Sequence, residues 1–159
     1  MKGEVRLKAP EIILFVALCF YAVMFVFFSL PGKGFAEYFS TMSSMNTDLM
    51  HLFLSRVVDQ GDLWLFSLIF VLDMVFFVLL GVYFYLKLKG QASRVGGNLR
   101  RMTALMAVLG PLSILADGIE TTTLQFMMHN VDSFPGSLVF VQTPFTFLAF
   151  GLDLLALFW

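Results

Sequence analysis

The segment LWLFSLIFVLDMVFFVLLGVYFYL, Leu63–Leu86, decides the fold class. Its only charged residue is Asp73, and at about 1.5 Å per residue it is long enough to cross a bilayer core of ~30 Å. Three more apolar runs have a similar length: residues 12–30, 102–127 and about 138–159. These runs do not alternate like barrel strands, and backbone in lipid must satisfy its own hydrogen bonds. We therefore predict an all-α integral membrane protein, a four-transmembrane-helix bundle.

Composition agrees with that class and excludes others. The chain has 159 residues, of which 59% are hydrophobic and 13% charged, whereas soluble domains are nearer ~25% charged. A net charge of −1 leaves no basic excess to bind nucleic acid. The single cysteine, Cys19, excludes an intramolecular disulfide and a thiolate zinc site. We expect one transmembrane domain over residues 1–159, surrounded by membrane lipids, and leave open a homo-oligomer or a partner membrane subunit.

The basic residues predict the orientation in the membrane. Eight of the ten lie in the N-terminal tail or in the segment between the second and third runs. They are Lys2, Arg6, Lys8, Lys87, Lys89, Arg94, Arg100 and Arg101. Since basic loops stay inside, we expect both termini to be cytoplasmic, in a bacterial inner (plasma) membrane. A cleaved signal peptide is the alternative interpretation of the first run.

The segment between the first two runs predicts an amphipathic helix over residues 46–59. Asn46 or Thr47 suits its N-cap. Apolar residues follow at roughly helical spacing: Leu49, Leu52, Phe53 and Val57. Such a helix fits either the outer membrane interface or a lid over a binding site.

Four acids lie inside the apolar runs, and these runs contain no lysine or arginine. They are Asp73, Asp117, Glu120 and Asp153. An ionised acid at the centre of a lipid-facing helix costs roughly 2.5–3.5 kcal/mol, so we expect these side chains to face the bundle interior. Counted at about 1.5 Å per residue from the outer ends, Asp73 and Asp117 lie ~15 Å deep and Glu120 ~10 Å.

Helical spacing places further polar residues beside the acids. Ser113, Asp117, Glu120 and Thr121 share one face of the third run. Gln142, Thr146 and Asp153 share one face of the fourth. Pro111 and Pro144 are expected to bend these two helices. If Thr143 caps the fourth helix before Pro144, Asp153 lies level with Asp73.

Several functions suit such a cavity. Carboxylates and hydroxyls bind divalent or monovalent cations, and they also hold amines or relay protons. Asp73, Asp117 and Glu120 are candidate cation ligands, with Tyr21, Gln142, Thr146 and Asp153 as further binding residues. His51 and His129, on the outer side, are candidate metal ligands. The structural alternative is that protonated acids hydrogen-bond the helices together.

The third run contains Ala116-Asp117-Gly118-Ile119-Glu120, and Leu72-Asp73 lies in the second. This pattern resembles a family of small, uncharacterised bacterial membrane proteins with an aspartate in the second helix and Asp-x-x-Glu-Asn in the third. Thr121 replaces that asparagine. The resemblance implies a four-helix bundle and no activity.

The leading hypothesis is therefore a membrane protein that binds a cation, or a small cationic or lipid-like ligand, at an acidic intramembrane cavity, with a transport role left open. An accessory subunit of a membrane complex is the second hypothesis. A membrane-embedded hydrolase that uses the carboxylates is the third, and it lacks a recognisable nucleophile motif. An enzyme is thus the less favoured class.

Overall fold

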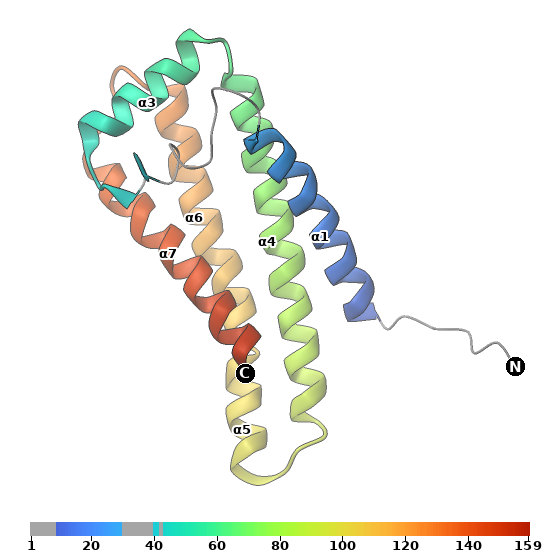
Figure 1. Cartoon of the computed structure of the whole chain (residues 1–159). Coiled ribbons are helices and arrows are strands. Elements are labelled where there is room, and N and C mark those ends of the chain that lie inside the picture. The colour runs from blue at the N-terminus through green and yellow to red at the C-terminus, as the bar shows by residue number, and fades with distance from the viewer. Residues whose placement is uncertain (1–8, 30–39, 42) are drawn as a thin grey trace, which may run out of the picture.

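A computed structural model describes residues 9–29, 40–41 and 43–159, and within those ranges every regular element is a helix (Figure 1). In chain order these are α1 (Ala9–Phe28), α3 (Thr47–Asp59), α4 (Leu63–Ala92), α5 (Gly97–Met106), α6 (Leu109–His129) and α7 (Ser137–Phe158). With α5 and α6 taken as one interrupted span, four helices are long and apolar enough to cross a membrane. The all-α fold class is confirmed, and so are four candidate spans.

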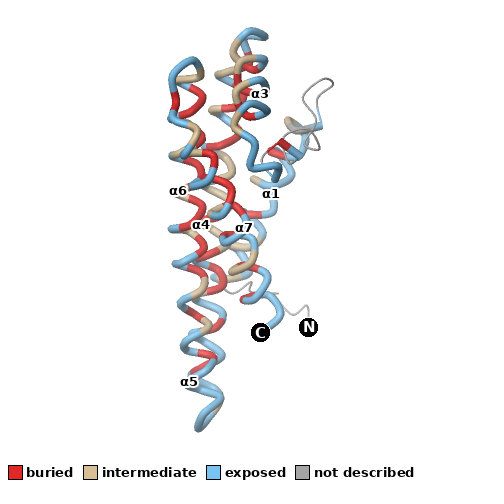
Figure 2. Tube along the Cα trace, turned by 90° about the vertical axis from the view of Figure 1, so that its left-hand side faces the viewer, coloured by how far each residue is buried: buried red, intermediate tan, exposed pale blue. Residues whose placement is uncertain are grey.

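The second span is longer than its apolar run predicts, because α4 continues from Leu86 to Ala92. Lys87 donates a hydrogen bond to the Tyr83 hydroxyl at 2.9 Å, and Lys89 donates one to the Tyr85 hydroxyl at 3.1 Å. Pairs four residues apart stabilise a helix, so the chain stays helical after its apolar run has ended. Helices α4 and α5 then project together beyond the C-terminal end of α7 (Figure 2).

Proline affects the third and fourth spans differently. In the third, residues 107 and 108 form a turn between α5 and α6, and Pro111 is the third residue of α6. Proline cannot donate to the carbonyl four residues earlier, here that of Ala107, so the predicted bend is present as a helix break. In the fourth, α7 begins at Ser137 and Pro144 lies inside it. Thr143 is therefore not the helix cap, and Asp153 lies ~24 Å along α7, deeper than Asp73 along α4.

The spanning helices pack in the order α1, α4, α6, α7, each mainly against the next, and α1 makes little contact with α7. Helices α4 and α6 approach closely where two glycines meet. A Cβ added to Gly81 would lie 2.7 Å from the Gly110 carbonyl oxygen, and a Cβ added to Gly110 would clash with the Gly81 carbonyl oxygen. Small residues at this point let the two backbones touch.

Helix α3 lies across one end of the spanning helices (Figure 1). The Asn46 side chain caps it by accepting hydrogen bonds from the backbone N–H groups of Asp48 and Leu49, at 2.9 and 3.1 Å. Its buried residues are Met50, Phe53, Leu54 and Val57. The predicted helix is present, but the predicted apolar face is not, because Phe53 and Val57 are buried whereas Leu49 and Leu52 are exposed. A helix embedded in an apolar cluster buries one face and leaves its other apolar residues outside.

Candidate functional site

The polar residues of α6 face the interior of the molecule. Ser113, Asp117, Glu120 and Thr121 are all buried, and Asp117 is only 1% exposed. Their spacing of four, three and one residues puts them on one side of the helix. The face predicted from the sequence is thus the face that packs against the neighbouring helices.

The matching face of α7 lies opposite. Gln142, Thr146 and Asp153 are buried there. The Gln142 side-chain amide donates a hydrogen bond to Glu120 Oε1 at 3.2 Å and another to the Thr146 hydroxyl at 3.1 Å. The Thr146 hydroxyl in turn donates to the backbone carbonyl oxygen of Gln142 at 3.3 Å. The two polar faces therefore meet inside one chain, where they form an interhelical network around Glu120.

Asp73 adds an acid from a third helix. The Asp73 carboxyl interacts electrostatically with the carboxyls of Asp117 and Glu120. The Asp117 carboxyl interacts in the same way with those of Glu120 and Asp153. We call these four side chains the acid cluster. Asp73 is only partly buried, unlike the three other acids. The cluster thus joins a partly exposed acid on α4 to buried acids on α6 and α7.

Several oxygen atoms in and around the cluster have no hydrogen-bond partner among the described residues. They are Asp117 Oδ1, both carboxyl oxygens of Asp153, and the hydroxyl oxygens of Ser113 and Thr121. The Ser113 hydroxyl faces the Asp153 carboxyl, but the geometry falls short of a hydrogen bond.

The residues that the structure describes supply no lysine, arginine or histidine to pair with the acid cluster. Isolated carboxylates are too costly to bury in an apolar medium. A proton or a bound cation must therefore neutralise them.

The predicted metal ligands are not brought together. Within the described ranges, no group of three or more His, Cys, Asp or Glu side chains is arranged to hold a metal ion. His51 Nδ1 lies 2.8 Å from the Val131 carbonyl oxygen, and its ring stacks on Phe134 with the centroids 3.8 Å apart. His129 Nδ1 lies 2.9 Å from the carbonyl oxygen of Gln125, one turn earlier in α6. Both Nδ1 atoms are thus engaged with backbone carbonyl oxygens, and the metal role of His51 and His129 stays a prediction.

Tyr21 does not lie in the buried polar network that it was expected to join. Its side chain is 44% exposed on α1, and its ring packs on Phe76 with the centroids 5.3 Å apart.

Two aromatic side chains that the sequence already places beside Asp73 link α4 to its neighbours. Phe76 and Phe77, one turn after Asp73, contact residues of α1 and α7. Their spacing of three and four residues from Asp73 was the available signal.

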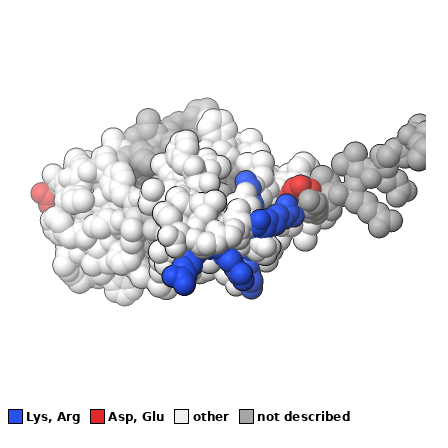
Figure 3. Space-filling view, turned by 90° about the horizontal axis from the view of Figure 1, so that it is seen from below, with Lys and Arg blue, Asp and Glu red and all other residues white. Residues whose placement is uncertain are grey.

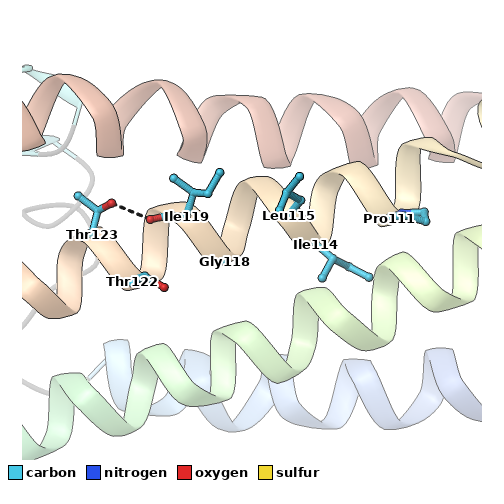
Figure 4. Close-up of a pocket in the computed structure, with 7 residues that line it drawn as sticks. All are labelled: Pro111, Ile114, Leu115, Gly118, Ile119, Thr122 and Thr123. Atoms are coloured by element: carbon cyan, nitrogen blue, oxygen red, sulfur yellow. Dashed lines mark hydrogen bonds between the residues drawn. The ribbon is translucent and has the colours of Figure 1, made fainter.

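A hollow of about 580 Å³ lies on another face of α6, away from the buried polar residues of that helix (Figure 4). Its lining comes from α6 alone: Pro111, Ile114, Leu115, Gly118, Ile119, Thr122 and Thr123. The Thr123 hydroxyl donates to the Ile119 carbonyl oxygen at 2.7 Å, which satisfies it within the helix. This hollow is a mostly apolar surface groove and contains no acid.

The described residues thus form helices, four of which are suited to cross a membrane, and three of these four helices supply the acids of the cluster. Comparison with protein-family models, with characterised proteins and with solved structures found no match. Function must therefore be argued from the site itself.

Proposed function

We propose that this chain is an integral membrane protein that binds a small organic cation at the acid cluster. The observation that carries the proposal is a set of interacting acids from α4, α6 and α7, in which Asp73 interacts electrostatically with Asp117 and Glu120, and Asp117 with Asp153, and the described interactions include no basic side chain. The unpaired oxygens of Asp117 and Asp153 add acceptors that a ligand can satisfy. A bound positive charge would offset the cost of burying these groups.

An organic cation suits the cluster better than a metal ion does. Calcium takes six to eight oxygen ligands at ~2.3–2.6 Å, and magnesium demands near-ideal octahedral geometry. The described acids offer no such arrangement. An ammonium group needs only hydrogen bonds or electrostatic contact, which carboxyl groups spread over three helices can provide.

We also propose the orientation that the sequence predicts. Lysine and arginine gather at the end of the molecule seen in Figure 3. Lys87, Lys89, Arg100 and Arg101 lie on the helical hairpin of α4 and α5 at this end. The positive-inside rule makes it cytoplasmic, which sets α3 at the outer interface. A bacterial inner membrane remains the proposed location.

The accessory-subunit hypothesis loses its main support. It required the polar faces of the third and fourth spans to be free for a partner's helices. In the structure, Glu120, Gln142 and Thr146 of those faces are buried against one another. The hydrolase hypothesis gains no observation that would favour it over binding.

The test is ligand binding to the full chain in nanodiscs of zwitterionic lipid, with empty nanodiscs as background. The probe is dodecylammonium, and neutral dodecanol is the matched compound. We expect saturable binding of the ammonium alone and a loss of ~10-fold or more in affinity for Asp117→Asn, because a buried charge pair is worth more than ~1.4 kcal/mol. Asp132→Asn, at an exposed acid outside the cluster, should bind like the wild type.

Equal binding by Asp117→Asn and the wild type would refute the proposal. So would equal binding of dodecanol and dodecylammonium. A parallel titration with Ca²⁺ alone separates the organic cation from a metal ion, since saturable Ca²⁺ binding that Asp117→Asn abolishes would overturn the choice made here.

A further inference from the structure

Four aromatic rings form a continuous row beside the acid cluster. Tyr21 of α1 packs on Phe76 of α4, with the centroids 5.3 Å apart. Phe76 packs on Phe77 at 5.3 Å, and Phe77 packs on Phe150 of α7 at 5.5 Å. We call Tyr21, Phe76, Phe77 and Phe150 the aromatic row. It runs from α1 across α4 to α7. The row therefore links α1 and α7, which otherwise make little contact.

The row adjoins the acids in two ways. Phe76 and Phe77 follow Asp73 by three and four residues, so all three side chains lie on one side of α4. Phe77 is buried and belongs to one packed cluster with Ala116 and Ala149. Ala116 is next to Asp117 in α6, and Ala149 lies between Thr146 and Asp153 on the buried face of α7. The inner part of the row therefore packs against the turns of α6 and α7 that carry Asp117 and Asp153.

The outer ends of the row are open to the surroundings of the protein. Tyr21 is 44% exposed and Phe150 is 42% exposed, whereas Phe77 is 3% exposed. Asp73, the partly exposed acid, is the member of the cluster on the same helix as Phe76 and Phe77. A ligand that approaches sideways from the bilayer meets rings first and carboxyl groups next.

This order of groups suits one class of ligand. The face of an aromatic ring attracts a cation by ~0.5–1 kcal/mol when exposed and ~2 kcal/mol when desolvated, and quaternary ammonium groups are the ligands most often held this way. They donate no hydrogen bond, so rings and carboxylates are the partners left to them. An apolar tail attached to such a head would remain among lipid chains, beside the exposed apolar residues of α1 and α7.

We infer that the aromatic row is the recognition element for a lipophilic quaternary ammonium compound, which reaches the acid cluster from the bilayer at the side of α4 that faces α1 and α7. The inference rests on the proposed function and specifies its ligand class and its binding residues. Tyr21, a binding residue predicted from the sequence, thereby acts through its ring.

The experiment measures dodecyltrimethylammonium binding to the full chain in zwitterionic nanodiscs, with dodecyldimethylamine N-oxide as the matched compound of zero net charge. Leucine replaces one ring at a time in Tyr21→Leu and Phe150→Leu, which keeps an apolar side chain and removes the π system. Phe140→Leu, at an exposed ring on α7 outside the row, is the control. We expect ~3-fold to ~30-fold weaker binding for each row variant, no change for the control, and weaker binding of the N-oxide to the wild type.

Asp117→Asn in the same assay distinguishes the two proposals. Binding that Asp117→Asn weakens, and that Tyr21→Leu and Phe150→Leu leave unchanged, would overturn the aromatic row and keep the acid cluster. Absence of saturable ammonium binding in the wild type would overturn both. A Phe140→Leu loss equal to those of the row variants would also overturn the inference, because it would show a general response to removing phenylalanine from α7.

Discussion

The close approach of α4 and α6 gives a sharp stability prediction at Gly110. In Gly110→Ala the new methyl group would clash with the Gly81 carbonyl oxygen, and it would lie 3.1 Å from the Gly81 carbonyl carbon. Both are backbone atoms, which cannot move away as a side-chain end can, so the helices must separate. Overpacking of this kind costs roughly 1–3 kcal/mol.

Gly118→Ala is the matched control, because it lies on the same helix and its added Cβ would meet nothing within 4 Å. Alanine favours the helix over glycine by ~0.5–1 kcal/mol at either site. This common gain cancels when the two variants are compared, so their difference measures the packing penalty. At about 2–4 °C per kcal/mol for a chain of this size, Gly110→Ala should melt about 2–12 °C below Gly118→Ala.

The assay is thermal unfolding of both variants in the same detergent, followed by intrinsic tryptophan fluorescence. Trp159 is a suitable reporter, because its indole N–H donates a hydrogen bond to the Thr103 hydroxyl at 3.2 Å and so links α7 to α5. Gly81→Ala should be destabilised as well, since its Cβ would lie 2.7 Å from the Gly110 carbonyl oxygen. Equal melting temperatures for Gly110→Ala and Gly118→Ala would refute the close crossing of the helices.

Two further predictions concern polar contacts. Asn46→Ala removes the side-chain cap of α3 and should cost ~0.5–2 kcal/mol in thermal unfolding; Asn98→Ala, at an exposed residue, should cost much less, and similar losses would contradict the capping role. Gln142→Leu removes the amide that donates to Glu120 and should cost ~1–2 kcal/mol. A Gln142→Leu variant as stable as Gln91→Leu, at an exposed glutamine, would show that the buried hydrogen bond contributes nothing.

The sequence predicted the spans well because hydrophobic length is a local property. The break before Pro111 was predictable for the same reason, since the missing N–H belongs to that residue alone. The extension of α4 past Leu86 was not, because hydropathy detects apolar runs and the stabilising contacts of Lys87 and Lys89 are polar. Asp153 was left at two alternative depths, because a proline is compatible both with a first helical turn and with a kinked interior.

The candidate site was predictable only where spacing along one helix decides the outcome. The polar face of α6 followed from helical periodicity, and Glu120 lies in it as expected. The position of the Tyr21 side chain could not be predicted, because α1 is apolar all round and its sequence does not specify which side faces α4. The distances among Asp73, Asp117 and Glu120 depend on how three helices pack, which no single span encodes. Because this packing brings no set of three ligands together among the described residues, the metal hypothesis gained no support.

The most direct test of the central claim is infrared difference spectroscopy of the full chain in nanodiscs, with and without dodecyltrimethylammonium. If Asp73, Asp117 and Glu120 form one site for a positive charge, ligand addition should change the carboxyl C=O bands. Asp73→Asn, Asp117→Asn and Glu120→Gln should each remove part of that change, and Asp132→Asn should leave it intact. A carboxyl region that does not respond to the ligand, or one whose response survives all three substitutions in the cluster, would contradict the account.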